Sequence, residues 1–388
     1  MGSEMCIRDR TTTQNTEIFD FQAQQKQLLA DTITLRNLLD EKLLWVPSVP
    51  AINLQWPSKV VKGAGEVFTG ANLKNSVGVF ASQFRQRLLL VFSAGIFVFG
   101  IMRLRKLVWA NVKMRAAMVG RVRDDSAWHT PITVLAGMFM ALPFPLIFGA
   151  IGGVLDLSGS TDPFIIGLTK GFYGLAVLSF IFMTWLTWDR DNSLFGTHFE
   201  LPTGIRCAVF SNLKWFLPVI GVLTLLLILS LQYSSENIYG GFSLFIFILT
   251  AISLSVFGAL IFYRDKKIMD NLFIENATLH SFRKVIVGGS IAFPILTALF
   301  AAVGYYASAY ELLYRAFVTG GILLLAYVVS GVIKRAITVA QRLIKYRQAM
   351  ERREAELKSR AEKIKAEQLG EDAPPQPPID QKRLMSPR

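Results

Sequence analysis

The chain has 388 residues, of which 52% are hydrophobic and 18% are charged, and its formal net charge is +13. The hydrophobic residues occur in long blocks, which excludes a soluble globular domain and indicates a polytopic membrane protein. Because the basic residues lie between these blocks and in the C-terminal tail, their charge indicates membrane topology, and we expect no nucleic-acid partner.

The first ten residues, MGSEMCIRDR, have neither the apolar core nor the cleavage site of a secretory signal peptide. The codons ATG-TGT-ATA-AGA-GAC-AGR encode MCIRDR, and they resemble the transposase mosaic end used in sequencing libraries. We therefore interpret residues 1–10 as a sequencing-adapter artefact and expect them to be disordered. With Cys6 set aside, Cys207 is the remaining cysteine, so no disulfide framework is expected.

Residues 11–84 are predicted to form a segment outside the membrane. Within it, residues 22–44 place apolar side chains such as Leu28 and Leu35 at helical spacing, which predicts a helix. Pro47 and Pro50 end this helix, because proline lacks the backbone N–H that would continue it.

Seven apolar blocks follow, and most are long enough to cross about 30 Å of hydrocarbon. They span residues 88–102, 131–155, 163–188, 215–231, 242–263, 285–307 and 312–333. The first block is short and crosses only if it includes neighbours such as Phe84 and Leu104. We therefore predict an all-α fold in which residues 85–333 form a membrane bundle of about seven transmembrane helices.

The loops between the blocks alternate in charge. Seven Lys and Arg residues lie between residues 103 and 123, after the first block, and further basic residues follow the third and fifth blocks. The loops DLSGSTD, YSSENIYGG and SAYE contain neither Lys nor Arg. The positive-inside rule therefore places the N-terminal segment outside and the C-terminus in the cytoplasm. Arg85 and Arg87, just outside the first block, depart from the pattern.

Residues 334–388 are predicted to be cytoplasmic. Lys334 to Gln368 alternates basic and acidic residues and has one apolar residue per heptad, which is too few for a coiled coil and predicts a solvated, charged helix. EDAPPQPP, at residues 371–378, predicts an extended linker.

The sequence offers no motif for catalysis, for a cofactor or for a metal. His129, His198 and His280 lack ligand spacing, and Lys170 is the one ionisable residue well inside an apolar block. We therefore expect no enzymatic activity, no cofactor and no metal site.

The candidate functional positions are those that bend or pack helices. Pro143, Pro145 and Pro294 lie inside apolar blocks, where proline kinks a helix. Gly149 and Gly153 have the four-residue spacing of small residues that lets membrane helices approach closely.

Three stretches carry a resemblance to a known family: LLDEKLLWVPSVPAINLQWP at 38–57, GYYASAYELLYRA at 304–316, and QRLIKYRQAMERREAE at 341–356, the last followed by the Pro-rich linker and IDQKRL. The loop LFGTHFELP at 194–202 adds a fourth, weaker match. In order and spacing these stretches resemble the inner membrane domain of the large, many-helix MscS-type mechanosensitive channels, of the potassium-efflux or miniconductance type.

The resemblance implies a tension-sensing peripheral domain of a channel that protects bacteria against hypo-osmotic shock. It implies the bacterial inner membrane, a periplasmic N-terminal segment, membrane lipids as partners, and a homo-oligomeric, heptameric parent. The pore-lining helix and cytoplasmic vestibule of that plan are not found in the sequence. We therefore interpret the chain as truncated at both ends and expect it to conduct no ions by itself.

Two alternatives stay open. A secondary transporter or permease subunit would be indicated by inverted repeats and buried charges, of which we find neither. A seven-helix membrane sensor would use the charged helix at 334–368 to signal inside the cell.

Overall fold

The computed structural model describes residues 46–121, 124–190, 192–263 and 277–369, together with Gln25, Gln27, Leu28 and Thr32. Within these residues the regular elements are helices and no strand occurs, which confirms the predicted all-α fold. The artefact proposed at 1–10, the linker at 371–378 and most of the helix predicted at 22–44 lie outside the described residues.

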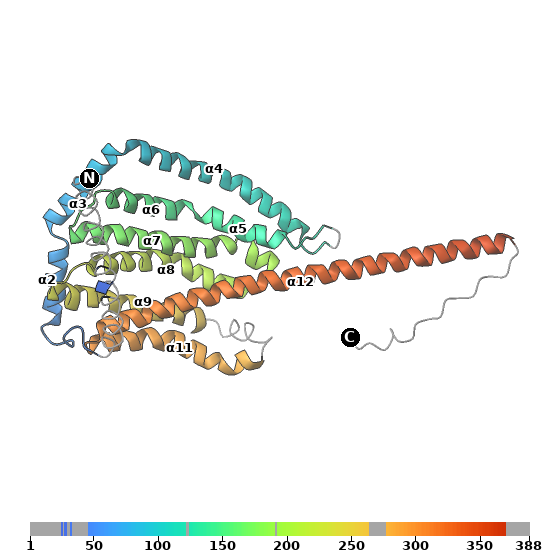
Figure 1. The fold of residues 1–388 in the computed structure, drawn as a ribbon. Coiled ribbons are helices and arrows are strands. Elements are labelled where there is room, and N and C mark those ends of the chain that lie inside the picture. Colours follow the sequence, from blue (N-terminus) through green and yellow to red (C-terminus); the bar gives the residue numbers. More distant parts are fainter. Residues whose placement is uncertain are drawn as a thin grey trace, which may run out of the picture.

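The described helices form a layered bundle (Figure 1). In chain order they are α2 (Trp56–Val67), α3 (Gly70–Gln86), α4 (Leu88–Met118), α5 (His129–Ala141), α6 (Pro143–Asp156), α7 (Pro163–Trp188), the π-helix η1 (Leu194–His198), α8 (Thr203–Ser230), the π-helix η2 (Asn237–Ser243), α9 (Leu244–Tyr263), α11 (Ala277–Ala302) and α12 (Tyr306–Leu369). In Figure 1, α2 and α3 lie across one end of the bundle, and α12 extends well beyond the other end.

The apolar helices occupy the positions of the predicted blocks. Among the described residues, four helices are long and apolar enough to cross a membrane: Pro163–Trp188, Arg206–Ser230, Asn237–Phe262 and Tyr306–Glu362. Two bent pairs, Trp56–Gln86 with Val91–Met118 and His129–Ala141 with Pro143–Asp156, bring the number to as many as six. Val287–Ala302 is a shorter apolar helix. A helical membrane bundle is therefore confirmed, whereas seven crossings stay a prediction.

The second predicted block is two helices and not one. α5 and α6 meet at Leu142 with a bend of 45°, and α6 begins at Pro143. Neither Pro143 nor Pro145 has an N–H to donate to the carbonyl four residues earlier, so the helical hydrogen-bond ladder is interrupted there. The bend follows directly from the two prolines.

The last predicted block and the charged helix are one continuous helix. α12 has 64 residues, and the predicted boundary at residue 333 falls inside it. The helix contains no proline, and its charged half satisfies its own backbone hydrogen bonds as readily in water as the apolar half does in lipid.

Helices α7 and α8 pack closely through glycines of α7. A Cβ added at Gly167 would lie 3.0 Å from the Cα of Leu229, and one added at Gly171 would lie 2.5 Å from Cδ1 of Leu225. Only residues without side chains let the two helices approach so closely. The glycines of α7 thus allow α7 and α8 to pack closely within the bundle.

Candidate functional site

Helix α12 is packed much less than the other long apolar helices. Of its most apolar 18-residue stretch, 6% is buried, against 39–44% in the other three candidate spans. Leu323, for example, is 66% exposed. Because the apolar part of α12 has few contacts with the bundle, the contacts at its first turn and around Arg335 determine how the helix is held.

The first turn of α12 is anchored by a buried tyrosine. Tyr306 is fully buried, and its hydroxyl lies 2.6 Å from Oγ of Ser243, which in turn lies 2.9 Å from Oγ of Ser230. The rings of Tyr239 and Phe247 meet the Tyr306 ring edge-on, with centroids 5.0 and 5.5 Å away. This Tyr306 cluster ties α12 to α8, η2 and α9.

The turn before α12 is held by the segment that precedes α2. The carbonyl of Gly304 accepts hydrogen bonds from the N–H groups of Ser48 (2.9 Å) and Val49 (3.2 Å), and the N–H of Ala307 donates to Oγ of Ser48 (3.0 Å). Gly304 has φ of +121°, which glycine adopts without strain. Two of the stretches that carry the family resemblance therefore contact each other here.

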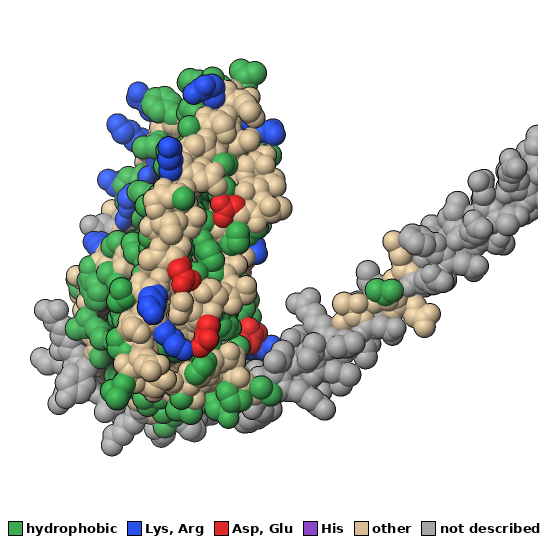
Figure 2. All heavy atoms as spheres, turned by 90° about the vertical axis from the view of Figure 1, so that its left-hand side faces the viewer, with side chains coloured by type: hydrophobic (Ala, Val, Ile, Leu, Met, Phe, Trp, Pro, Cys, Tyr) green, Lys and Arg blue, Asp and Glu red, His purple; other side chains and the backbone are tan. Residues whose placement is uncertain are grey.

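Helix α2 closes the same end of the bundle. Nε1 of Trp56 donates to the carbonyl of Gly240 (3.1 Å), and Nζ of Lys59 lies 2.6 Å from Oε1 of Glu236. Figure 2 looks onto this end and shows basic and acidic side chains on it. The start of α12 thus lies at an end of the bundle where a hydrogen bond and an ion pair hold α2 in place.

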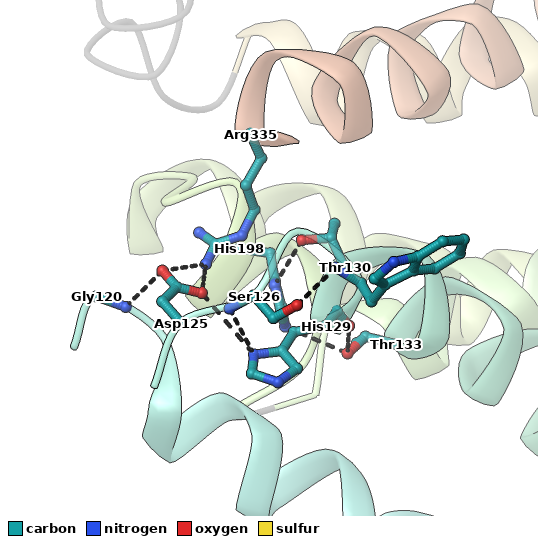
Figure 3. A network of polar contacts seen from close by, with 9 residues as sticks. Gly120, Asp125, Ser126, His129, Thr130, Thr133, His198 and Arg335 are labelled. Carbon is teal, nitrogen blue, oxygen red and sulfur yellow. Dashed lines mark hydrogen bonds and ion pairs between the residues drawn. The ribbon is translucent and has the colours of Figure 1, made fainter. Parts of the chain in front are cut away.

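At the far end of the bundle a buried ion pair holds α12. Nη2 of Arg335 lies 3.1 Å from both carboxylate oxygens of Asp125, which precedes α5, and the two side chains are 8% and 5% exposed (Figure 3). Asp125 also accepts the N–H of Gly120 (3.0 Å) and lies 3.8 Å from Nδ1 of His129. The pair therefore joins α12 to the loop between α4 and α5.

A buried histidine completes this Arg335 cluster. His198, the last residue of η1, contacts Oγ1 of Thr130 through Nδ1 (3.1 Å) and Oγ1 of Thr133 through Nε2 (3.2 Å). Thr133 donates its own proton to the carbonyl of His129 (2.8 Å), so it accepts from Nε2–H of His198. Burial, and then the positive charge of Arg335, lowers the pKa of His198 to about 4. The imidazole is therefore neutral at pH 7 and locks η1 onto α5.

The loop after η1 reaches α12 directly. The ring of Phe199 lies against Gly331 so closely that a Cβ there would be 2.5 Å from Cζ of Phe199. The ring of Tyr327 meets Phe199 edge-on at 6.1 Å. The loop LFGTHFELP, another stretch of the family resemblance, is thus packed on α12 beside the Arg335 cluster.

The three candidate prolines lie away from both clusters. Pro143 and Pro145 lie at the start of α6, at the bend, and Pro294 lies inside α11, where its carbonyl accepts the hydroxyl of Thr297 (2.7 Å). Their place in the mechanism stays a prediction.

The two candidate glycines face α7 at ordinary distance. A Cβ at Gly149 would lie 3.9 Å from Cβ of Ala176, and one at Gly153 would lie 3.8 Å from Oη of Tyr173. The close approach of α6 to α7 occurs at Gly152, where a Cβ would lie 3.1 Å from the Tyr173 ring. Spacing alone could not identify Gly152, because it does not show how the helix is rotated.

Sequence reasoning missed the residues of the Arg335 cluster. One signal was present, since Asp124 and Asp125 are acidic residues that follow a strongly basic segment. A second was the position of His198 inside the LFGTHFELP stretch. Among the described residues, no three His, Cys, Asp or Glu side chains lie together as metal ligands would.

Comparison with known proteins agrees with this architecture. Residues 88–386 match the family described as mechanosensitive ion channel inner membrane domain 1. The miniconductance mechanosensitive channel MscM of Escherichia coli (strain K12) is 26% identical over 82% of this chain and 29% of its own length. The mechanosensitive channel MscK of the same organism is 23% identical over 93% of this chain and 31% of its own length.

An uncharacterized MscS family protein of Haemophilus influenzae is 22% identical over 89% of this chain and 31% of its own length. No solved structure matches the chain. The chain thus spans a little under a third of the length of the curated relatives that it matches. Since the family match covers more than half of its residues, the chain belongs to the inner membrane domain family of MscS-type mechanosensitive channels.

Proposed function

We propose that this chain is the tension-sensing, peripheral membrane part of a mechanosensitive channel that protects bacteria against hypo-osmotic shock. The observation that carries the proposal is that α12 is anchored at the Tyr306 cluster and again at the Arg335 cluster, with little packing between them. Bilayer tension favours the conformation in which the protein occupies the larger area in the membrane plane. Because α12 is tied to the bundle at two places, it moves with the lipid-facing helices when that conformation forms.

The membrane setting is part of the same proposal. We place the chain in the bacterial inner membrane with residues 11–84 in the periplasm and the C-terminus in the cytoplasm, because the Lys- and Arg-rich loops alternate with loops that have none. Membrane lipids are its partners, its parent assembles as a homo-oligomer (a heptamer, by family resemblance), and the chain has no catalytic role. A permease or sensor function is not favoured, since the named relatives are mechanosensitive channels.

Patch clamp tests the proposal on a complete channel polypeptide that contains this sequence, expressed in bacteria without other mechanosensitive channels. The wild type is expected to open under suction, and Asp125→Asn is expected to need more suction, because α12 is no longer tied to the α4–α5 loop. Exchanging the charges (Asp125→Arg with Arg335→Asp) is expected to restore part of the sensitivity. Glu311→Gln, in an exposed ion pair with Arg315, is the control and is expected to behave as wild type.

The results separate two claims. If the complete polypeptide gives no tension-gated current, it is not a mechanosensitive channel. If it does, but Asp125→Asn opens at the wild-type suction, the Arg335 cluster does not transmit tension.

The bend and packing positions belong to the same proposal. The α5–α6 bend at Pro143 and Pro145 lets one helix of the pair move relative to the other without unfolding. Gly149 and Gly153 leave room for α6 to shift against α7, and Pro294 interrupts the hydrogen-bond ladder of α11. Pro143→Ala with Pro145→Ala is expected to shift the opening suction. Pro163→Ala is the matched control, because Pro163 begins α7 after a loop, so its missing N–H interrupts no continuing helix. Equal suction for both variants would remove the bend from the mechanism.

A further inference from the structure

A basic cavity opens beside the α5–α6 bend. It has a volume of about 800 Å³ and lies between α4, the junction of α5 and α6, the end of α7 and the beginning of α8. Helix α4 forms one wall and the bundle forms the others, so the volume of the cavity depends on how closely α4 lies to the bundle.

Most of the charged side chains that line this cavity are cationic. They are Arg105, Lys113, Arg190, Arg206 and Lys214, and among the described lining residues the one carboxylate is that of Asp189. Asp189 is already engaged, because its Oδ1 accepts from Nε of Arg206 at 2.7 Å. The positive charge of the cavity therefore exceeds its negative charge, and like charges that are held together repel each other unless an anion joins them.

Two of these cations converge on one aromatic ring. Nζ of Lys113 lies 5.7 Å and Cζ of Arg190 lies 5.6 Å from the centroid of Trp109. The Trp109 ring holds both cations in place by cation–π attraction. A fixed pair of cations beside an indole matches a phosphate group at the membrane interface, where tryptophan is itself favoured.

Apolar side chains also line the cavity. Met183 and Leu186 line the cavity from α7, within two helical turns before Asp189, and Phe144 lines it from α6. On α4, next to Arg105, Leu104 and Leu107 are 48% and 63% exposed and face away from the core. The cavity is thus lined by both cationic and apolar side chains, and α4 exposes apolar side chains beside it.

We propose that this cavity binds an anionic glycerophospholipid, with its phosphate between Arg105, Lys113 and Arg190 and an acyl chain along the wall of Met183 and Leu186. A soluble phosphate would satisfy the cations but would leave the apolar wall in contact with water. The proposal needs only that the chain lies in a bilayer, so it stands or fails independently of the tension-sensing role.

Binding is measured on the full chain in mild detergent by native mass spectrometry, with phosphatidylglycerol, phosphatidylcholine and inorganic phosphate as probes. Phosphatidylglycerol is expected to bind with at least about tenfold higher affinity than phosphatidylcholine, and Arg105→Gln with Arg190→Gln is expected to abolish that preference, because charge-assisted contacts with phosphate are lost. Arg103→Gln with Arg121→Gln removes the same charge outside the cavity and is expected to leave the preference unchanged.

The other outcomes overturn the proposal. Equal binding of the two lipids, or an equal loss in the control variant, would show attraction by net charge without a site. Displacement of phosphatidylglycerol by millimolar phosphate would show a soluble anion site. Circular dichroism checks that the variants fold, and Lys113→Gln is the second variant if the double variant does not. A preference for phosphatidylglycerol that survives Lys113→Gln undiminished would likewise contradict the proposal.

Discussion

The Asp125–Arg335 pair joins two residues that are 210 positions apart in sequence. Both side chains are buried, so each charge depends on the other for its solvation. In the part of the chain that the structure describes, Nε of Arg335 is buried without a hydrogen-bond partner, so the pair is not fully satisfied. Such a pair specifies where α12 lies more than it adds to stability.

Removal of one partner is expected to cost more than removal of both. Asp125→Ala should lower the free energy of unfolding by about 3 kcal/mol, because the charge of Arg335 stays buried. Adding Arg335→Leu should recover part of this loss, as measured by thermal unfolding of the purified chain in detergent. Glu311→Ala, in the exposed pair with Arg315, should change stability by less than about 0.5 kcal/mol. A double variant less stable than Asp125→Ala would contradict this reading.

His198 makes the chain sensitive to acid. Its pKa is about 4 in the folded protein, against a usual value of 6.5 in the unfolded chain, so between these values the folded state binds fewer protons. Stability therefore falls as the pH drops below about 6.5, by about 2 kcal/mol at pH 5. His198→Gln should reduce the difference in melting temperature between pH 7 and pH 5. An unchanged difference would assign the acid sensitivity to other groups.

Helices α6 and α7 differ in how much they depend on the absence of a side chain at a glycine. The backbone oxygen of Leu229 would lie 3.0 Å from a Cβ at Gly167, so α8 would have to move, whereas α6 leaves room for a Cβ at Gly149. Small residues at four-residue spacing occur in both helices, yet they are in tight contact in only one of them.

Alanine substitutions at glycines of α7 and α6 are expected to have different effects on stability. Gly167→Ala should lower the free energy of unfolding by about 1–3 kcal/mol through overpacking. Gly149→Ala should change it by less than about 1 kcal/mol, or stabilise the chain slightly, because alanine favours the helix. Melting temperatures in detergent check both substitutions. A Gly149→Ala variant as unstable as Gly167→Ala would mean that α6 packs more tightly than these distances show.

At one end of the molecule, contacts between distant segments hold the bundle together, and at the other end α12 extends beyond it. The segment before α2, the turn at Gly304 and the Tyr306 cluster are linked at the closed end, and α12 leaves the bundle beyond Arg335 (Figure 1). This polarity fits the proposed orientation, in which α12 continues into the cytoplasm.

Cysteine labelling tests that orientation. Cys207 is exposed near the start of α8, on the side proposed to be cytoplasmic. In a Cys6→Ser background, a membrane-impermeant maleimide should label Cys207 only after the inner membrane is permeabilised. Ser234→Cys, placed in the opposite loop of a chain without other cysteines, should be labelled in cells whose inner membrane is intact. The reverse pattern would invert the topology.

Local patterns in the sequence are sufficient to predict the membrane class, the all-α fold, the approximate positions of the apolar helices and the family. These follow from local properties, since a run of about 20 apolar residues must satisfy its backbone as a helix in lipid, wherever the rest of the chain lies. The bend at Pro143 is local in the same sense, because a missing N–H breaks the helix at its own position.

The contacts between distant residues, in contrast, could be identified only from the folded bundle. The rotation of α6 brings Gly152 into the tightest approach to Tyr173, whereas Gly149 and Gly153 keep ordinary distances from α7. The folding of the bundle brings Asp125, His198 and Arg335 into one cluster. Some of the basic side chains that indicated topology in the sequence also line a cavity, because α4 passes beside the end of α7 and the beginning of α8. Contacts of this kind depend on the packing of distant segments, which the hydropathy of each segment does not specify.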